Sequence, residues 1–456
     1  MVQEGDNCIK RISNLPIQKM IKNFLKSNII ANFDNRIFFV FMIRAGGAVF
    51  SLIASLIVTR ALGATEYGIV AYALSWMSIL SIPAKLGTDS IIVREVSILK
   101  GKHEFNKIIG LFILSTKTVF LSSFIVFSVS MAVFWKFGNA SLLLPLLFSL
   151  LMLPFISINS IQQAVIRGCN KVLRSQAPEM ILNPLLLISI IGSGALVGFH
   201  FTHKGVLLLH LLITIVISLV LFRMVTLLYP AIKPINPSRQ ELQSLAKSIL
   251  PFTLIGAMSI INGRADVVMI GVIDSTESAG IYNIATNGAD LISFMLVAVN
   301  IVLAPIIARL YSQKEIFNLE TILRKASKVA VIATLPILAI FAFAGGWLLD
   351  LFGPRFIDGQ HALIILSIGQ LVNAGAGSVA LLLNMSGHEK NTAIGFGMAA
   401  IGNVILNIIL IPEFGINGAA IATFTSTSVW NILLLRSVIV KFNINPSIAG
   451  KRIQIG

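Results

Sequence analysis

The sequence predicts an all-α integral membrane protein with twelve transmembrane helices, arranged as two six-helix bundles that are related by an internal repeat. Three observations predict this fold class: the apolar composition, the number of long apolar stretches, and the asymmetric placement of the basic residues. Of the 456 residues, 56% are hydrophobic and only 12% are charged, and the mean hydropathy is +0.89. Soluble domains are about 45–50% apolar and about 25% charged. The composition therefore argues against a soluble enzyme and against a disordered chain.

Twelve apolar stretches are long enough to cross a bilayer, whose hydrocarbon core of about 30 Å requires about 20 residues of helix. Lipid offers backbone groups no hydrogen-bond partner, and the alternating pattern of a barrel strand is absent, so each stretch predicts a helix. The predicted spans are residues 37–59, 65–86, 108–134, 141–162, 177–199, 205–228, 249–273, 279–306, 327–350, 360–385, 392–411 and 416–439.

The lysine and arginine residues orient these spans. Of the 35, 28 fall in segments on the same side as the N-terminus, three lie within spans, and four fall in the opposite loops, namely Arg60, Lys136, Lys204 and Arg355. Cytoplasmic segments carry an excess of basic residues, so both termini are predicted to be cytoplasmic. The net charge of +16 then follows from topology, and no nucleic-acid partner is expected.

Residues 1–36 predict a basic cytoplasmic segment, because no short apolar core precedes a small-residue cleavage site of a signal peptide. Apolar residues recur there at helical spacing between lysines, which is typical of an amphipathic helix lying on anionic membrane lipids. A helix that binds a partner protein is the alternative. The pattern consists of Ile17, Met20, Ile21, Phe24 and Leu25, with Lys19, Lys22 and Lys26 between them.

A sequence repeat with a period near 213 residues, or six spans, predicts the two bundles. The segments Leu62–Ile69 and Ile273–Tyr282 share Thr-Glu followed by Gly-Ile, with one residue inserted in the second copy. A weaker pair joins Arg167–Lys171 to Ser386–Lys390. Because six is even, the two halves have the same orientation and should be related by an axis along the membrane normal.

Pro230, Pro234 and Pro237 indicate a linker between the halves. Two bundles with a cleft between them are typical of a transporter. No predicted loop is long enough for a catalytic domain, and a P-loop is absent, so the chain is not expected to be an enzyme. The predicted organisation is a basic amphipathic segment (1–36), an N-terminal bundle (37–229), a cytoplasmic linker (230–246), a C-terminal bundle (247–441) and a cytoplasmic tail (442–456).

Five ionisable residues stand out inside the predicted spans: Arg44, Lys117, Arg264, Asp266 and Asp290. A charge at the centre of a span costs at least about 2.5–3.5 kcal/mol, so each requires an explanation. Arg44 and Arg264 lie in corresponding helices of the two halves, and with Lys117 they are predicted to bind substrate in a water-filled cavity. Guanidinium groups bind phosphate oxygens bidentately, which suits a diphosphate. The alternative is that these charges only neutralise one another.

Asp266 and Asp290 are predicted to serve coupling or charge pairing. Arg264 and Asp290 lie at similar predicted depths in neighbouring antiparallel spans and should pair, whereas Asp266 lies about 200° around the helix from Arg264. If substrate captured Arg264, the freed Asp290 would bind a proton or a sodium ion; otherwise Asp290 only neutralises Arg264. No cofactor or metal site is expected, because Cys8 and Cys169 have no His or Cys neighbour at ligand spacing.

Four segments resemble the Wzx-type polysaccharide flippases of the MOP superfamily: Arg44–Gly47, Thr59–Gly68, Leu86–Asp89 and Asn384–Lys390. The resemblance implies the MOP-type fold and alternating access. It implies transport of an undecaprenyl-diphosphate-linked oligosaccharide, such as an O-antigen repeat unit for lipopolysaccharide biosynthesis, from the cytoplasmic to the periplasmic leaflet of a bacterial inner membrane. A polysaccharide polymerase and a chain-length regulator are the protein partners that it implies.

Two other function classes stay open at this point. A cation-coupled small-molecule antiporter of related fold would rely on buried carboxylates more than on cations, whereas here three cations face two carboxylates inside the spans. A membrane enzyme, such as an O-antigen polymerase or a glycosyltransferase, would carry a long polar loop. Neither the sugars carried nor the coupling ion follows from the sequence.

Overall fold

The structure is a computed structural model that describes residues 35–229, 234–235 and 237–450. The chain divides into two compact units, Met1–Met42 and Ile43–Gly456. In the first unit only the beginning of one helix is described, so most of the predicted amphipathic segment lies outside the described residues. The second unit contains the elements discussed below, and every regular element described in it is a helix.

The first half of the chain forms the helices that surround one side of the later site. A π-helical turn, η1, joins two shorter helices in it. The elements are α3 (Asn35–Lys85), α4 (Thr88–Gly101), α5 (Phe105–Phe137), α6 (Ala140–Leu150), α7 (Leu153–Gly168), α8 (Val172–Ala177), η1 (Pro178–Leu182), α9 (Asn183–Leu196) and α10 (His203–Leu228).

The second half begins inside the predicted linker, because α11 extends back to Arg239. A short 3₁₀ helix, η2, precedes α14. The elements are α11 (Arg239–Ile273), α12 (Thr276–Ser312), α13 (Ile316–Asp350), η2 (Pro354–Gly359), α14 (Gln360–Ala376), α15 (Val379–Met385) and α16 (Glu389–Phe442).

The described helices are compatible with the twelve predicted spans. Eight are long and apolar enough to cross a membrane, and two further bent helix pairs meet the same criterion together. Two of the eight, Met42–Lys85 and α16, have 44 and 54 residues, which at 1.5 Å per residue is about twice the hydrocarbon thickness. Each contains a glycine with non-helical dihedral angles, Gly63 and Gly415. Each is therefore compatible with two predicted spans joined at the kink.

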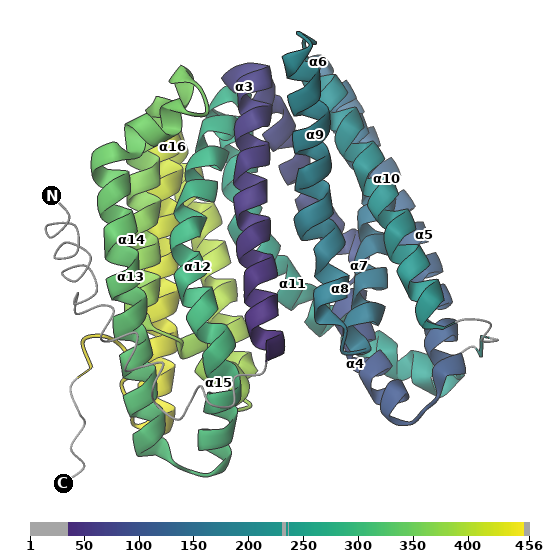
Figure 1. The fold of residues 1–456 in the computed structure, drawn as a ribbon, viewed down its shortest axis with the longest axis vertical. Coiled ribbons are helices and arrows are strands. Elements are labelled where there is room, and N and C mark those ends of the chain that lie inside the picture. The colour runs from purple at the N-terminus through teal and green to yellow at the C-terminus, as the bar shows by residue number, and fades with distance from the viewer. Residues whose placement is uncertain (1–34, 230–233, 236, 451–456) are drawn as a thin grey trace, which may run out of the picture. The chain divides into compact units, whose positions relative to one another are not determined.

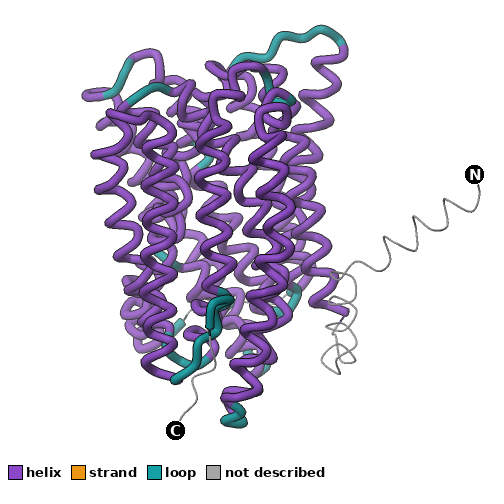
Figure 2. Tube along the Cα trace, turned by 90° about the vertical axis from the view of Figure 1, so that its left-hand side faces the viewer, coloured by secondary structure: helices purple, strands orange, loops and turns teal. Residues whose placement is uncertain are grey.

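Within the second unit, the helices of each half contact mainly one another. In the first half α7 contacts α4, α5 and α10; in the second, α14 contacts α12, α13 and α16. Figure 1 shows α4–α10 on one side of α3 and α12–α16 on the other, and Figure 2 shows the helices running nearly parallel. Because these helices are apolar on most faces, they can pack on neighbours and on lipid alike. This arrangement places helices of both halves around a common interior.

The two copies of the repeat touch each other where α3 meets α12. A Cβ added to Gly68 would lie 2.0 Å from the Thr276 carbonyl oxygen, and one added to Gly280 would lie 2.6 Å from the Cα of Gly68. Beside them, Thr65 Oγ1 donates a hydrogen bond of 2.8 Å to Glu277 Oε2. Equivalent residues of two copies contact each other only close to the axis that relates the copies. We call this region, which includes Gly63, the Gly63 end; the predicted topology puts it on the periplasmic side of the membrane.

Candidate functional site

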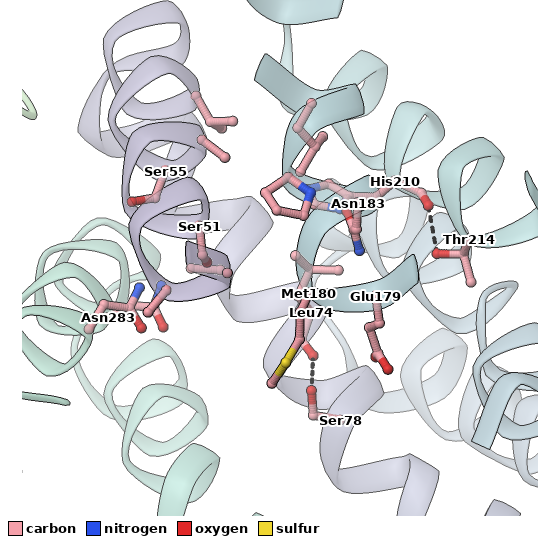
Figure 3. Close-up of a pocket in the computed structure, with 18 of the residues that line it drawn as sticks. Ser51, Ser55, Leu74, Ser78, Glu179, Met180, Asn183, His210, Thr214 and Asn283 are labelled. Atoms are coloured by element: carbon pink, nitrogen blue, oxygen red, sulfur yellow. Dashed lines mark hydrogen bonds between the residues drawn. The ribbon is translucent and has the colours of Figure 1, made fainter. Parts of the chain in front are cut away.

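A cavity of about 820 Å³ lies between the halves of the second unit. We call it the central cavity. It is lined from α3, α7, η1, α9 and α10 of the first half and from α11 and α12 of the second. Figure 3 shows serines of α3 on one side and the side chains of η1, α9 and α10 on the other. Its polar and ionisable lining residues are Arg44, Ser51, Ser55, Tyr67, Ser78, Asn159, Glu179, Asn183, His210, Thr214, Arg264, Asn283 and Asn287.

Arg44 and Arg264, which the sequence places in corresponding spans, both line the central cavity. The Nε of Arg44 is buried without a hydrogen-bond partner, and no hydrogen bond or ion pair of its side chain occurs within the described part of the chain. Arg264 Nη1 donates to Asn283 Oδ1 at 3.2 Å, and Asn283 Nδ2 donates to the Tyr67 hydroxyl at 2.8 Å. Since a guanidinium has five N–H donors, both arginines retain unused donors that face the cavity. This geometry suits an anion with several oxygens.

Lys117 does not share this environment. Its side chain is exposed on α5, and the residue is absent from the cavity lining. A long basic side chain on the outer face of a span can extend its ammonium towards the membrane surface, which removes the need for a buried partner. The geometry therefore gives the predicted substrate-binding role of Lys117 no support.

The predicted ion pair between Arg264 and Asp290 is not formed among the described residues, and Arg264 bonds to Asn283 instead. The reason is the register of the two helices. The helix α12 begins at Thr276, three residues before the predicted span, so Asp290 lies about 14 residues after the start of α12. Arg264 lies only about nine residues before the end of α11, which is the neighbouring helix end. At 1.5 Å per residue this offset is about 7 Å. Asp290 lines a side cavity of about 360 Å³ that shares Ser51 and other residues with the central one.

Asp266 lies outside the central cavity, in a buried polar cluster with 5% of its surface exposed. Its Oδ2 accepts from the Tyr282 hydroxyl at 2.8 Å and from Thr423 Oγ1, and its Oδ1 accepts from Asn407 Nδ2 at 2.7 Å. Asn407 Nδ2 also bonds to Asn403 Oδ1 at 3.0 Å, while Asn407 Oδ1 is buried without a partner. Neutral donors, rather than a cation, thus compensate this carboxyl group. The cluster joins α11, α12 and α16.

The Asp266 cluster brings carboxylate, amide and hydroxyl oxygens close together. Carboxylate, amide and hydroxyl oxygens are the donors that hard cations prefer. No group of three or more His, Cys, Asp or Glu side chains that could hold a metal ion occurs among the described residues. The oxygens of the cluster could hold a proton or a monovalent ion.

Sequence reasoning missed two ionisable residues of the central cavity. Glu179 lies in η1, near the start of the predicted span 177–199, and His210 lies in α10, inside the predicted span 205–228. Both positions carry the signal that drew attention to Arg44, namely an ionisable side chain within an apolar stretch. Glu179 Oε2 accepts a hydrogen bond of 2.6 Å from Gln163 Nε2. The cavity is therefore less uniformly cationic than predicted.

Comparison with known proteins places this geometry in context. A sequence model of the family described as polysaccharide biosynthesis protein matches residues 35–311. The probable flippase AglR of Haloferax volcanii is 30% identical over 177 residues, which cover 38% of this chain and 37% of that relative. The match thus spans little more than a third of AglR.

Two solved structures share the fold. An inward-facing multidrug resistance MATE family transporter of the MOP superfamily has a TM-score of 0.72 at 16% identity, covering 87% of this chain and 94% of the other. The lipid II flippase MurJ, in an inward closed conformation, has a TM-score of 0.64 at 17% identity and 89% coverage of both chains. Likeness at this identity concerns the fold alone, and it confirms the predicted MOP-type transporter fold.

Proposed function

Since the chain belongs to the polysaccharide biosynthesis protein family, we propose that it is a flippase that moves a lipid-linked oligosaccharide between the leaflets of a membrane by alternating access. The more specific proposal is an undecaprenyl-diphosphate-linked oligosaccharide, such as an O-antigen repeat unit, carried from the cytoplasmic to the periplasmic leaflet of a bacterial inner membrane. Both termini would be cytoplasmic, and a polymerase and a chain-length regulator would act on the product.

The observation that carries the proposal is the pair of arginines in the central cavity. Arg44 and Arg264 come from opposite halves, and neither forms an ion pair at contact distance within the described chain, although Asp290 lies close enough to attract Arg264. A guanidinium with a buried, unbonded Nε, such as that of Arg44, is costly between apolar helices unless an anion binds beside it, and the exposed Arg264 is accessible to the same anion. A diphosphate offers oxygens to both guanidinium groups at once. Release of the diphosphate would follow when the halves separate and the two arginines move apart.

The contacts at the Gly63 end support alternating access. There α3 and α12 touch through Gly68 and Gly280. Arg60 also bridges the halves, because its Nε donates to the Leu351 carbonyl at 2.5 Å and its Nη2 to the Asp350 carbonyl at 2.7 Å. In the proposed cycle these contacts close the cavity towards the periplasm and break when the cargo is released. The cavity is then exposed to one side of the membrane at a time.

Coupling to a proton or sodium gradient is part of the proposal, with Asp266 as the first candidate and Asp290 as the second. A cation bound at Asp266 would replace hydrogen bonds from Tyr282 and Thr423, which belong to different helices. Its binding would therefore change how α11, α12 and α16 pack. Asp290 is exposed in the side cavity; within the described residues its carboxylate accepts no hydrogen bond from a second helix, although it lies close enough to attract Arg264 of α11.

The test is transport by the purified full chain in proteoliposomes that contain a fluorescent undecaprenyl-diphosphate-linked oligosaccharide. Arg44→Ala and Arg264→Ala should abolish flipping, and lysine at either position should restore it only in part, because a point charge replaces a bidentate fork. Arg223→Ala, an exposed arginine on α10 away from the cavity, is the matched control and should be fully active. Full activity of both cavity variants would refute the proposal. Export of a cationic drug instead of the lipid would favour the antiporter.

A further inference from the structure

The side of the central cavity that faces away from Arg264 carries a second set of polar groups. Five lining residues make up what we call the Glu179 wall: Asn159 of α7, Glu179 of η1, Asn183 of α9, and His210 and Thr214 of α10. Figure 3 shows the last four on neighbouring helices, across the cavity from Ser51, Ser55 and Asn283. Four of the five members form two i, i+4 pairs, Glu179 with Asn183 and His210 with Thr214, so successive turns present polar groups to the same space.

The wall has hydrogen-bonding capacity that the protein itself does not use. Asn159 is 5% exposed; its Nδ2 donates to the Thr214 carbonyl at 3.4 Å, but its Oδ1 has no partner. Buried amide oxygens are almost always paired, so an unpaired one that lines a cavity indicates a missing donor. The side chains of Asn183 and His210 make no hydrogen bond within the described chain. The wall therefore offers acceptors and donors side by side.

The charge of Glu179 determines which part of the cargo can bind here. Its carboxylate accepts from Gln163 and forms no ion pair with any described residue, so it stays available as an acceptor. A carboxylate repels a diphosphate across a cavity of low dielectric constant, whereas sugar hydroxyls are neutral donors that a carboxylate accepts well. The amide and imidazole groups can both donate to and accept from hydroxyls. The side of the cavity with Arg264 and Asn283 is thus cationic, whereas the side that holds Glu179 is suited to neutral hydroxyl groups.

We propose that the Glu179 wall binds the sugar next to the diphosphate, and that Asn159 and Glu179 select which sugar the protein accepts. The inference rests on the proposed function, because it requires a diphosphate held by Arg44 and Arg264. A cavity of about 820 Å³ lies high in the range of about 300–1,000 Å³ that is usual for small-molecule sites, so it has room for a sugar beside the diphosphate. A site that pairs with a hydroxyl rejects analogues that lack it far more strongly than an apolar pocket does.

The experiment compares two kinds of lipid on the full chain in nanodiscs. One is undecaprenyl diphosphate alone; the other is the same lipid carrying glucose, galactose or N-acetylglucosamine. In the unmodified protein at least one sugar should tighten binding over the bare diphosphate. Glu179→Gln should remove about tenfold or more of that gain, because hydrogen bonds to charged groups contribute about 1.5–3 kcal/mol. The same variant should bind the bare diphosphate equally well or slightly better, since a repelling charge is gone.

Three further variants separate the possible outcomes. Asn159→Ala and Asn183→Ala should each reduce the sugar gain alone, while Arg44→Ala should weaken both kinds of lipid. Glu413→Gln, an exposed acid on α16 away from the cavity, is the matched control and should change neither. An equal loss for both lipids in Glu179→Gln and Asn183→Ala, or no gain from any sugar in the unmodified protein, would overturn the inference. Failure of the unmodified protein to bind either lipid would overturn the proposed function as well.

Discussion

The close approach of α3 and α12 predicts that Gly68→Ala shifts the protein away from the conformation described here. The new methyl carbon would lie 2.0 Å from the Thr276 carbonyl oxygen and 2.9 Å from the Cα of Glu277. These neighbours are backbone atoms, so no side chain can rotate away to relieve the overlap. Only separation of the two helices can do so, and that separation is the motion that would open the Gly63 end.

The size of the shift follows from the cost of overpacking, which is typically about 1–3 kcal/mol. The gain of about 1 kcal/mol from replacing a helical glycine by alanine acts in both conformations and cancels between them. The equilibrium should therefore move towards the separated state by about 5- to 150-fold. Gly280→Ala, whose methyl carbon would lie 2.6 Å from the Cα of Gly68, should act in the same direction.

Spin labels on each half report this shift directly. Cysteines at Val197, after α9, and Ile357, in η2, are exposed positions for a distance measurement by pulsed electron paramagnetic resonance. In Gly68→Ala the longer distances should gain population, and transport should slow because the closed state becomes rare. Gly402→Ala places the same methyl group in open space and should leave the distances unchanged. An unchanged distribution in Gly68→Ala would refute the argument that this contact must open.

Three other variants test the remaining parts of the structure. Arg60→Ala removes hydrogen bonds to the carbonyls of Asp350, the last residue of α13, and of Leu351, which follows it. The same spin labels should then show a shift of about two- to fivefold towards the separated state, which is smaller than for a buried contact because Arg60 is exposed. An unchanged distance distribution would mean that Arg60 does not help to hold the two halves together. Lys117→Ala should keep the transport rate within about twofold of the unmodified protein, because the exposed side chain lies outside the cavity. Arg44→Ala should lower the transport rate at least about tenfold. Equal losses in the two variants would mean that Lys117 belongs to the substrate site. Asp266→Asn should retain the fold but lose acceleration by an imposed proton or sodium gradient; if Asp290→Asn alone lost it, Asp290 would be the coupling residue.

The sequence alone was sufficient for the membrane class, the all-helical fold and the family resemblance, and its twelve predicted spans are compatible with the described helices. Hydropathy is a local property, because each span must satisfy its own backbone in lipid. The repeat further placed Arg44 and Arg264 in corresponding helices, and the structure brings both to one cavity. The bends at Gly63 and Gly415 fall between spans that hydropathy already separates.

What the sequence did not determine depends on how helices are set against one another. Arg264 bonds to Asn283 rather than to Asp290 because a three-residue change in where α12 begins moves every side chain by about 4–5 Å along its neighbour. Glu179 and Gln163 meet only because the chain folds back after α7 and brings η1 within hydrogen-bond distance of it, and Asp266 finds its donors on two other helices. An apolar stretch shows that a helix spans the membrane. In lipid, however, a helix has no polar outer face from which the side that packs on other helices could be recognised. The partners of a buried polar group are therefore determined only by the packed structure.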